Sequence, residues 1–207
     1  MRQSQHVSQL QSYNALVRNL LVILLLSVLV LGTAFGQAKP GLDKQGVYQN
    51  QEIGFSFTPP SGLTDVTAKA NGSAKPDPNS IALLLFELSG PNSNDLQWRG
   101  LAVQSYTRAQ VSMPDDFDVE SRMSRTITGK DWTETAAPTK VTIGDNTFAF
   151  SQFQHNRGLL KQYSHVYTTI IHGQLVAFAF TANSTAQLDD MKAALKTLTV
   201  MPSASGK

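Results

Sequence analysis

The chain has 207 residues, with 17 lysines and arginines, 15 aspartates and glutamates, and no cysteine. Without cysteine there are no disulfides and no lipid-modified lipoprotein cysteine, so stability must come from core burial, which one domain of this length can supply. The small charge excess argues against nucleic acid or an anionic membrane surface as partners, because both need a clear basic surplus.

A leader is the first predicted element. A polar stretch carrying Arg2 and Arg18 precedes the apolar run 20–31, and small residues follow. This order is typical of a secretory signal peptide over residues 1–36, cleaved after Gly36, although the pattern Gly36-Gln37-Ala38 also fits. The alternative is an uncleaved N-terminal membrane anchor. The apolar run of about twelve residues is shorter than the roughly 20 residues of a spanning helix, which favours cleavage.

Cleavage would make Gln37 the mature N-terminus and leave 15 basic and 15 acidic residues, a net charge of zero. We then expect a secreted or periplasmic protein that meets the membrane only through its signal sequence. Residues 37–47 are predicted to be a polar linker and 48–201 a single α+β domain. Residues 202–207 are predicted to be a flexible tail.

The first half of this domain is predicted to consist of short strands and loops. Residues 53–58 place apolar side chains at alternate positions, which predicts a strand ended by Pro59-Pro60. The range 66–80 contains Asn-Gly and two prolines and predicts an exposed loop. Two further strands are predicted over 81–88 and 98–108. The strand over 81–88 shows almost no alternation of apolar and polar residues, as expected when both faces of a sheet are covered.

A helix is predicted over residues 114–127. Pro114 suits a first-turn position, and four acidic residues lie in the first turns. The acidic run 115–120 could also suggest calcium, but it lacks the glycine and the spaced oxygen ligands of an EF-hand loop. A connecting segment is expected over 133–139.

Residues 140–200 predict an antiparallel meander closed by a helix. Four apolar-rich runs are separated by Asp145-Asn146, by 156–158 and by His172-Gly173. If His172 and Gly173 form the last turn, Ile171 faces Gln174 and earlier residues pair in step. One face of this hairpin, here called the aromatic face, then carries Tyr163, His165, Tyr167, Val176, Phe178 and Phe180. The opposite face, here called the alanine face, carries Val166, Thr168, Ile170, Leu175, Ala177 and Ala179.

Neither face is strongly polar, so we expect layers on both sides of the sheet. One layer should be the C-terminal helix, which begins near the N-cap types Asn183, Ser184 and Thr185. Its apolar stripe consists of Leu188, Met191, Leu195 and Leu198, and Pro202 prevents continuation.

Several segments recur, in this order, in one known family. They are Tyr48, Gly54-Phe55-Ser56-Phe57, Pro60-Ser61-Gly62, the turn and strand at 144–150, the hairpin around Gly173 and the closing helix. Over about 48–200 the chain resembles PsbP-like proteins. The resemblance implies an α/β/α sandwich, found in the photosystem II oxygen-evolving complex and in bacterial exported proteins of unknown role. Leu63 replaces a frequent tryptophan, and the closing helix lacks the usual terminal phenylalanine. The resemblance therefore implies the fold and places no functional residue.

Candidate functional residues are few. The domain has three histidines, His155, His165 and His172. We take Tyr163, His165 and Tyr167 as candidate binding residues, although a histidine between two tyrosines is more often packed than ligating. We expect no metal and no cofactor, because zinc needs three or four convergent ligands and no close histidine pair exists. No nucleophile elbow and no phosphate-binding glycine loop is present.

The sequence therefore predicts a monomeric, exported, non-catalytic binding or assembly module for a protein or small-molecule partner that it does not identify. The alternative is a secreted hydrolase that uses a histidine of the meander, His165, with an acidic partner. An exposed His165 in a pocket beside a carboxylate would favour the hydrolase. A closed aromatic face would favour the module.

Overall fold

The computed structural model describes residues 41–73, 82–90, 96–107, 117, 121, 124–125, 128 and 130–202. The predicted leader and most of the predicted helix 114–127 lie outside these residues. The boundaries of the leader, linker, domain and tail stay predictions. No helix in the described residues is both long enough and apolar enough to span a membrane.

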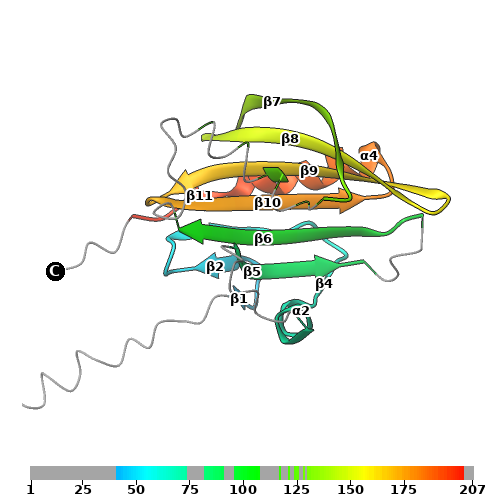
Figure 1. Ribbon diagram of the computed structural model, residues 1–207. Coiled ribbons are helices and arrows are strands. Elements are labelled where there is room, and N and C mark those ends of the chain that lie inside the picture. The colour runs from blue at the N-terminus through cyan, green and yellow to red at the C-terminus, as the bar shows by residue number, and fades with distance from the viewer. Residues whose placement is uncertain are drawn as a thin grey trace, which may run out of the picture. The chain divides into compact units, whose positions relative to one another are not determined.

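A seven-stranded antiparallel sheet forms the centre of the fold (Figure 1). Its strands, in spatial order, are β4 (Thr64–Asp65), β5 (Ala82–Ser89), β6 (Arg99–Thr107), β10 (Gln174–Ala182), β9 (Leu160–Ile171), β8 (Asn146–Arg157) and β7 (Thr133–Ile143). The predicted meander is therefore present. Residues 133–139 were expected to be a connector. That expectation is wrong, because these residues pair with β8 as part of β7.

A smaller sheet is built from both ends of the domain. Its order is β1 (Gly41–Leu42), β2 (Tyr48–Asn50), β3 (Phe55–Phe57) and β11 (Thr199–Val200). Strand β1 lies within the range expected to be a linker. The last strand of the chain pairs with β3, with Val200 opposite Phe55. The first and last parts of the described chain are thus hydrogen-bonded to each other.

Two short α-helices and one 3₁₀ helix accompany the sheets in the described residues. Helix α4 (Thr185–Lys192) has Ser184, one of the three predicted N-cap candidates, as its N-cap and continues into the 3₁₀ helix η2 (Ala193–Thr197). Helix α2 (Thr67–Ser73) lies in the range expected to be a loop, so that expectation is wrong. The backbone N–H of Thr67 donates to Asp65 Oδ1 over 2.9 Å, just before the first helical bond, from Ala70 N–H to the Val66 oxygen.

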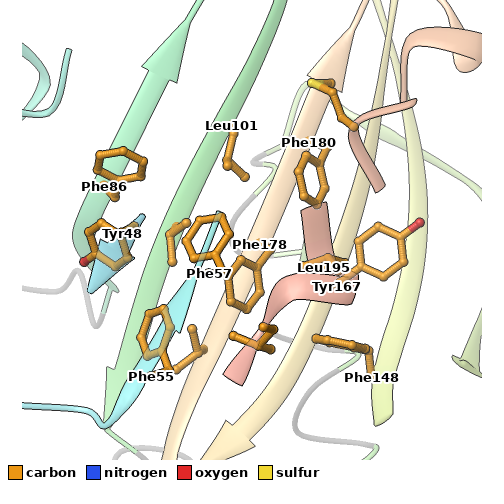
Figure 2. Close-up of a cluster of buried hydrophobic side chains, with 14 of the residues drawn as sticks. Tyr48, Phe55, Phe57, Phe86, Leu101, Phe148, Tyr167, Phe178, Phe180 and Leu195 are labelled. Carbon is orange, nitrogen blue, oxygen red and sulfur yellow. The ribbon is translucent and has the colours of Figure 1, made fainter. Parts of the chain in front are cut away.

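The hairpin register is confirmed. Ile171 pairs with Gln174 and Tyr167 with Phe178, and both turn residues have positive φ, 48° at His172 and 79° at Gly173. The aromatic face carries the main core (Figure 2), which includes Tyr48, Phe55, Phe57, Phe86, Phe148, Tyr167, Phe178, Phe180 and Leu195. Small-sheet strand β3 and the segment α4–η2 cover this face, so it is closed.

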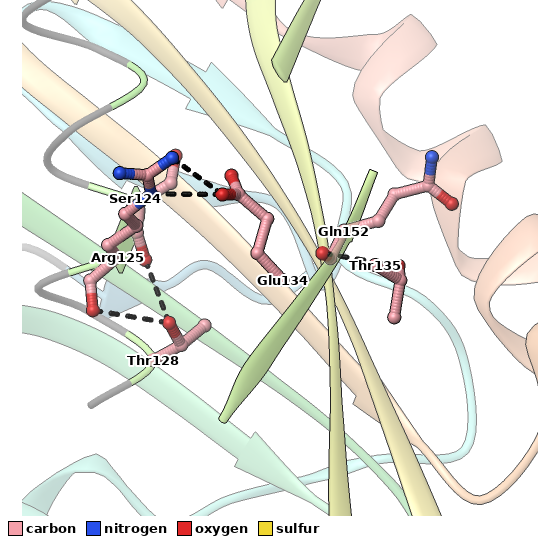
Figure 3. A network of polar contacts seen from close by, with 6 residues as sticks. All are labelled: Ser124, Arg125, Thr128, Glu134, Thr135 and Gln152. Carbon is pink, nitrogen blue, oxygen red and sulfur yellow. Dashed lines mark hydrogen bonds and ion pairs between the residues drawn. The ribbon is translucent and has the colours of Figure 1, made fainter. Parts of the chain in front are cut away.

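The alanine face carries a second core cluster. It contains Tyr106, Phe153, Val166, Leu175, Ala177 and Ala179, with Trp132 packed against it. The described residues between 117 and 128 are helical, and Arg125 joins this helical segment to the sheet through a 2.6 Å ion pair with Glu134 (Figure 3). Both faces are thus covered, and the predicted α+β sandwich is confirmed.

Candidate functional site

The predicted binding residues lie on the closed aromatic face. Tyr167 is 1% exposed and stacks on Phe150 at a centroid distance of 4.7 Å. Its burial raises the pKa of its hydroxyl, so this group stays protonated. His165 is 8% exposed, and Tyr163 is partly buried. Binding by these three residues stays a prediction, and in this structure two of them are packed inside the protein.

His165 is a buried histidine with unsatisfied hydrogen-bonding capacity. Its ring meets Phe150 edge-on at 5.1 Å, and no described residue hydrogen-bonds its Nδ1. Burial lowers the pKa of His165, Asp189 on α4 acts to raise it, and Lys192 acts to lower it further. Because burial dominates, the neutral ring is the favoured form.

The three histidines lie in separate places. His155 Nδ1 is 2.8 Å from the backbone oxygen of Asp131, and His172 Nδ1 is 3.0 Å from that of Ile53. His165 pairs with Gln152 in the sheet, so His155, three residues further along β8, points to the opposite face. Among the described residues, no three His, Asp or Glu side chains are placed to hold one metal ion.

A cavity of about 170 Å³ lies on the alanine face, and it was not predicted. The described residues that line it are Glu87, Leu88, Trp98, Gly100, Leu101, Ala102, Gln104, Thr128, Trp132, Ser164, Ala179 and Thr181. They come from strands β5, β6, β9 and β10, from the segment before β6, and from the helical segment and loop before β7. The cavity is thus formed by segments that are distant in the sequence.

Small side chains aligned across three strands create this cavity. Ala179 of β10 lies opposite Ala102 of β6, and Thr181 lies opposite Gly100. On the other side Thr181 lies opposite Ser164 of β9, and the two hydroxyls are 3.3 Å apart. Larger residues at these positions would fill the space. The sequence did show an alanine face on β10, but it gave no pairing partner for β6.

The two tryptophans of the chain both line the cavity, and both are held in place. Trp98 Nε1–H donates to Ser89 Oγ over 3.3 Å. Its ring lies so close to Gly100 that an added Cβ there would be 3.2 Å from Trp98 Cζ2. Trp132 packs against the ring of His155, with centroids 5.3 Å apart. The aromatic sides of the cavity are therefore set before any ligand binds.

Glu87 is the single charged side chain among the described residues of the lining. Its backbone N–H donates to Thr67 Oγ1 over 3.0 Å, which joins α2 to β5. Its carboxylate makes no hydrogen bond and no ion pair with any described residue. Burial raises its pKa. The described part of the lining thus combines two indole rings, a small-residue base and one acid without a charged partner among the described residues.

Comparisons with known proteins give structural matches alone. No protein-family model and no curated protein matches the chain. The solution structure of cyanobacterial PsbP (CyanoP) from Synechocystis sp. PCC 6803 is 15% identical over 82% of this chain and 98% of its own, with a TM-score of 0.50.

Two other bacterial structures match with lower TM-scores. A protein from Bacteroides thetaiotaomicron VPI-5482 is 14% identical over 74% of this chain, with a TM-score of 0.45, and the matched part is 47% of its length. This chain therefore spans about half of that protein. LpqN of Mycobacterium tuberculosis, which is involved in cell envelope biogenesis, is 9% identical over 72% of this chain and 83% of its own, with a TM-score of 0.43. The fold comparison rests on the cyanobacterial protein. The chain has a PsbP-like α+β sandwich fold.

Proposed function

We propose that this protein is an exported, non-catalytic binding module that holds a small ligand, or a side chain of a partner, in the cavity between Trp98 and Trp132. The observation that carries the proposal is the cavity itself. It is preformed, it is lined by two fixed indole rings, and it has a few polar groups, which is the usual composition of a ligand site.

The arrangement of the histidines supports binding over hydrolysis. The hydrolase alternative needs His165 exposed beside a carboxylate, but the ring is buried in the aromatic face. Ser164, the adjacent residue, lines the cavity on the opposite face of the sheet. A nucleophile and a base on opposite faces cannot come within the roughly 3 Å that proton transfer requires.

The size of the cavity sets the size of the bound group. A volume of about 170 Å³ is close to the roughly 150 Å³ of an apolar cavity that binds benzene. The bound group is therefore about as large as one six-membered ring. A larger ligand would place one end group inside and leave the rest in contact with solvent or with a partner.

Tryptophan fluorescence tests this proposal, since both tryptophans of the chain line the cavity. The probes are choline, 3,3-dimethyl-1-butanol, benzyl alcohol and propionate, which differ in charge but fit the volume. We expect saturable changes with at least one of them, and loss of these changes in Ala102→Val, which adds two methyl groups to the cavity. The matched control is Ala136→Val, on an exposed position of β7.

Absence of saturable binding of all four probes would contradict the proposal, as would unchanged binding in Ala102→Val. Thermal unfolding of each variant shows whether it is folded. Backbone amide chemical shifts at Gly100 and Ala179 provide a second measurement at the base of the cavity. They distinguish binding at this site from fluorescence changes caused elsewhere.

A further inference from the structure

We infer that the group bound in this cavity is an alkylammonium cation, held by the rings of Trp98 and Trp132 and by the carboxylate of Glu87. This inference rests on the proposed function and specifies its ligand class. The chemistry is that of a trimethylammonium or similar compact, positively charged and largely apolar group. Its size is suited to a cavity of about 170 Å³.

Charge is the first argument. Among the described residues of the lining, the single charged group is an acid, and no lysine, arginine or histidine offsets it. A partly buried carboxylate without a counter-charge is unfavourable, and a bound cation would supply the missing charge. An anionic ligand would add a second negative charge beside Glu87. A neutral ligand would desolvate Glu87 further without compensation.

The aromatic groups are the second argument. Indole is the ring that attracts a cation most strongly, and aromatic cages are the common means of binding quaternary ammonium groups. Here the two indoles are fixed in advance, Trp98 by Ser89 and the adjacent glycine backbone, and Trp132 by His155. Fixed rings lose little conformational entropy when a ligand enters.

The polar groups of the lining are the third argument. Gln104 Oε1 accepts a hydrogen bond from the Tyr106 hydroxyl over 2.9 Å, and Ser164 Oγ accepts one from Thr181. These oxygens give the cavity partial negative charge in addition to that of Glu87. Small residues, Gly100, Ala102 and Ala179, form the rest of the base, so methyl groups can approach the sheet closely.

A pair of isosteric probes tests the charge requirement. Choline and 3,3-dimethyl-1-butanol have the same shape, but only choline is charged. We expect choline to bind at least tenfold more tightly than the alcohol, as measured by tryptophan fluorescence. In Glu87→Gln this preference should fall to about twofold or less. The matched control, Glu52→Gln on an exposed residue, should leave it unchanged.

Equal binding of the two probes, or an unchanged preference in Glu87→Gln, would overturn the inference. If both probes bind equally and Ala102→Val abolishes both, the cavity is a binding site but not a cation site, so the proposed function survives alone. If Glu87→Gln unfolds, Glu87→Asp is the second variant. It keeps the charge but withdraws it from the cavity, and it should weaken choline binding while the alcohol is unaffected.

Vesicles identify the source of the cation. A lipid headgroup is the source if two results are obtained. The protein co-sediments with phosphatidylcholine vesicles and free choline abolishes this, and it does not co-sediment with phosphatidylglycerol vesicles. Binding of free choline without co-sedimentation would assign it to a soluble ligand. Equal co-sedimentation with both vesicle types, unaffected by choline, would overturn a lipid headgroup as the source of the cation.

Discussion

Replacement of Gly54 by alanine should disrupt the contact between the small sheet and the last hairpin. Gly54 has a φ of +87°, and a Cβ there would lie 2.6 Å from His172 Nδ1 and 2.7 Å from Cε1. The backbone oxygen of Gly54 also accepts from the N–H of Met201 over 2.9 Å, next to β11. The turn at His172, the turn before β3 and the C-terminal strand therefore meet at one glycine.

The cost of this change has two parts. A non-glycine residue at this φ costs about 1–2 kcal/mol in backbone strain. The His172 ring must also move, which breaks its 3.0 Å contact with the Ile53 oxygen, worth about 0.5–1.5 kcal/mol. We expect the free energy of unfolding to fall by about 2–4 kcal/mol, and the melting temperature by roughly 4–16 °C, since 1 kcal/mol corresponds to about 2–4 °C at this size.

Urea denaturation of two further variants isolates the contribution of His172. Gly46→Ala is the matched control, because Gly46 has a φ of +79° but nothing within 4 Å of an added Cβ. Gly46→Ala should lower the free energy of unfolding by the cost of backbone strain alone. In a His172→Asn background, Gly54→Ala should cost no more than Gly46→Ala does, since asparagine tolerates the positive φ and is shorter. Equal costs for the two glycine variants in the wild-type background would refute this reasoning.

Three further predictions concern the core, pH and the N-terminus. Phe178→Ala should cost about 3–5 kcal/mol, because Phe178 is fully buried against Phe57 and Phe55; an unchanged urea midpoint would contradict it. Burial lowers the pKa of His165 below 6.5, so its contribution to stability is complete above pH 6.5 and is lost as pH falls through the lowered pKa. Urea midpoints between pH 7.5 and 5 should therefore fall less in His165→Leu than in the wild type, and parallel curves would contradict this. Intact-mass measurement of exported protein should give Gln37, or a residue within two positions of it, as the N-terminus, whereas a full-length, membrane-retained species would establish the anchor.

Local patterns were enough to predict the last hairpin and the closing helix. The turn His172-Gly173 fixed the register of β9 and β10, because a two-residue turn leaves no freedom in pairing. Ser184 marked the start of α4 through its side-chain oxygen. Helix α2 was missed because its sequence is rich in turn residues. The hydrogen bonds of Thr67 to Asp65 and to Glu87 stabilise it in ways that local propensity does not reveal.

The cavity depends on pairing between strands that are distant in sequence. Ala102 and Ala179 become neighbours only because β6 pairs with β10, across 77 residues. Trp98 and Trp132 are also far apart in the chain, so their positions in the sequence do not predict that both line one cavity. The sequence therefore indicated where side chains are small, but not that two indoles and one acid surround that space.

The small sheet also determines when this domain can finish folding. Strand β3 has β2 on one side, but its other partner, β11, is made last, and Val200 follows Phe55 by 145 residues. At about 5–20 residues per second of synthesis, β3 waits roughly 7–29 seconds with one unpaired edge. Until then the aromatic side chains of β3 lack part of their cover, and the unpaired edge of β3 is open to pairing with other strands. The small sheet is thus complete only after the two strands 145 residues apart have met, so its closure depends on contacts distant in sequence and is expected to be slow.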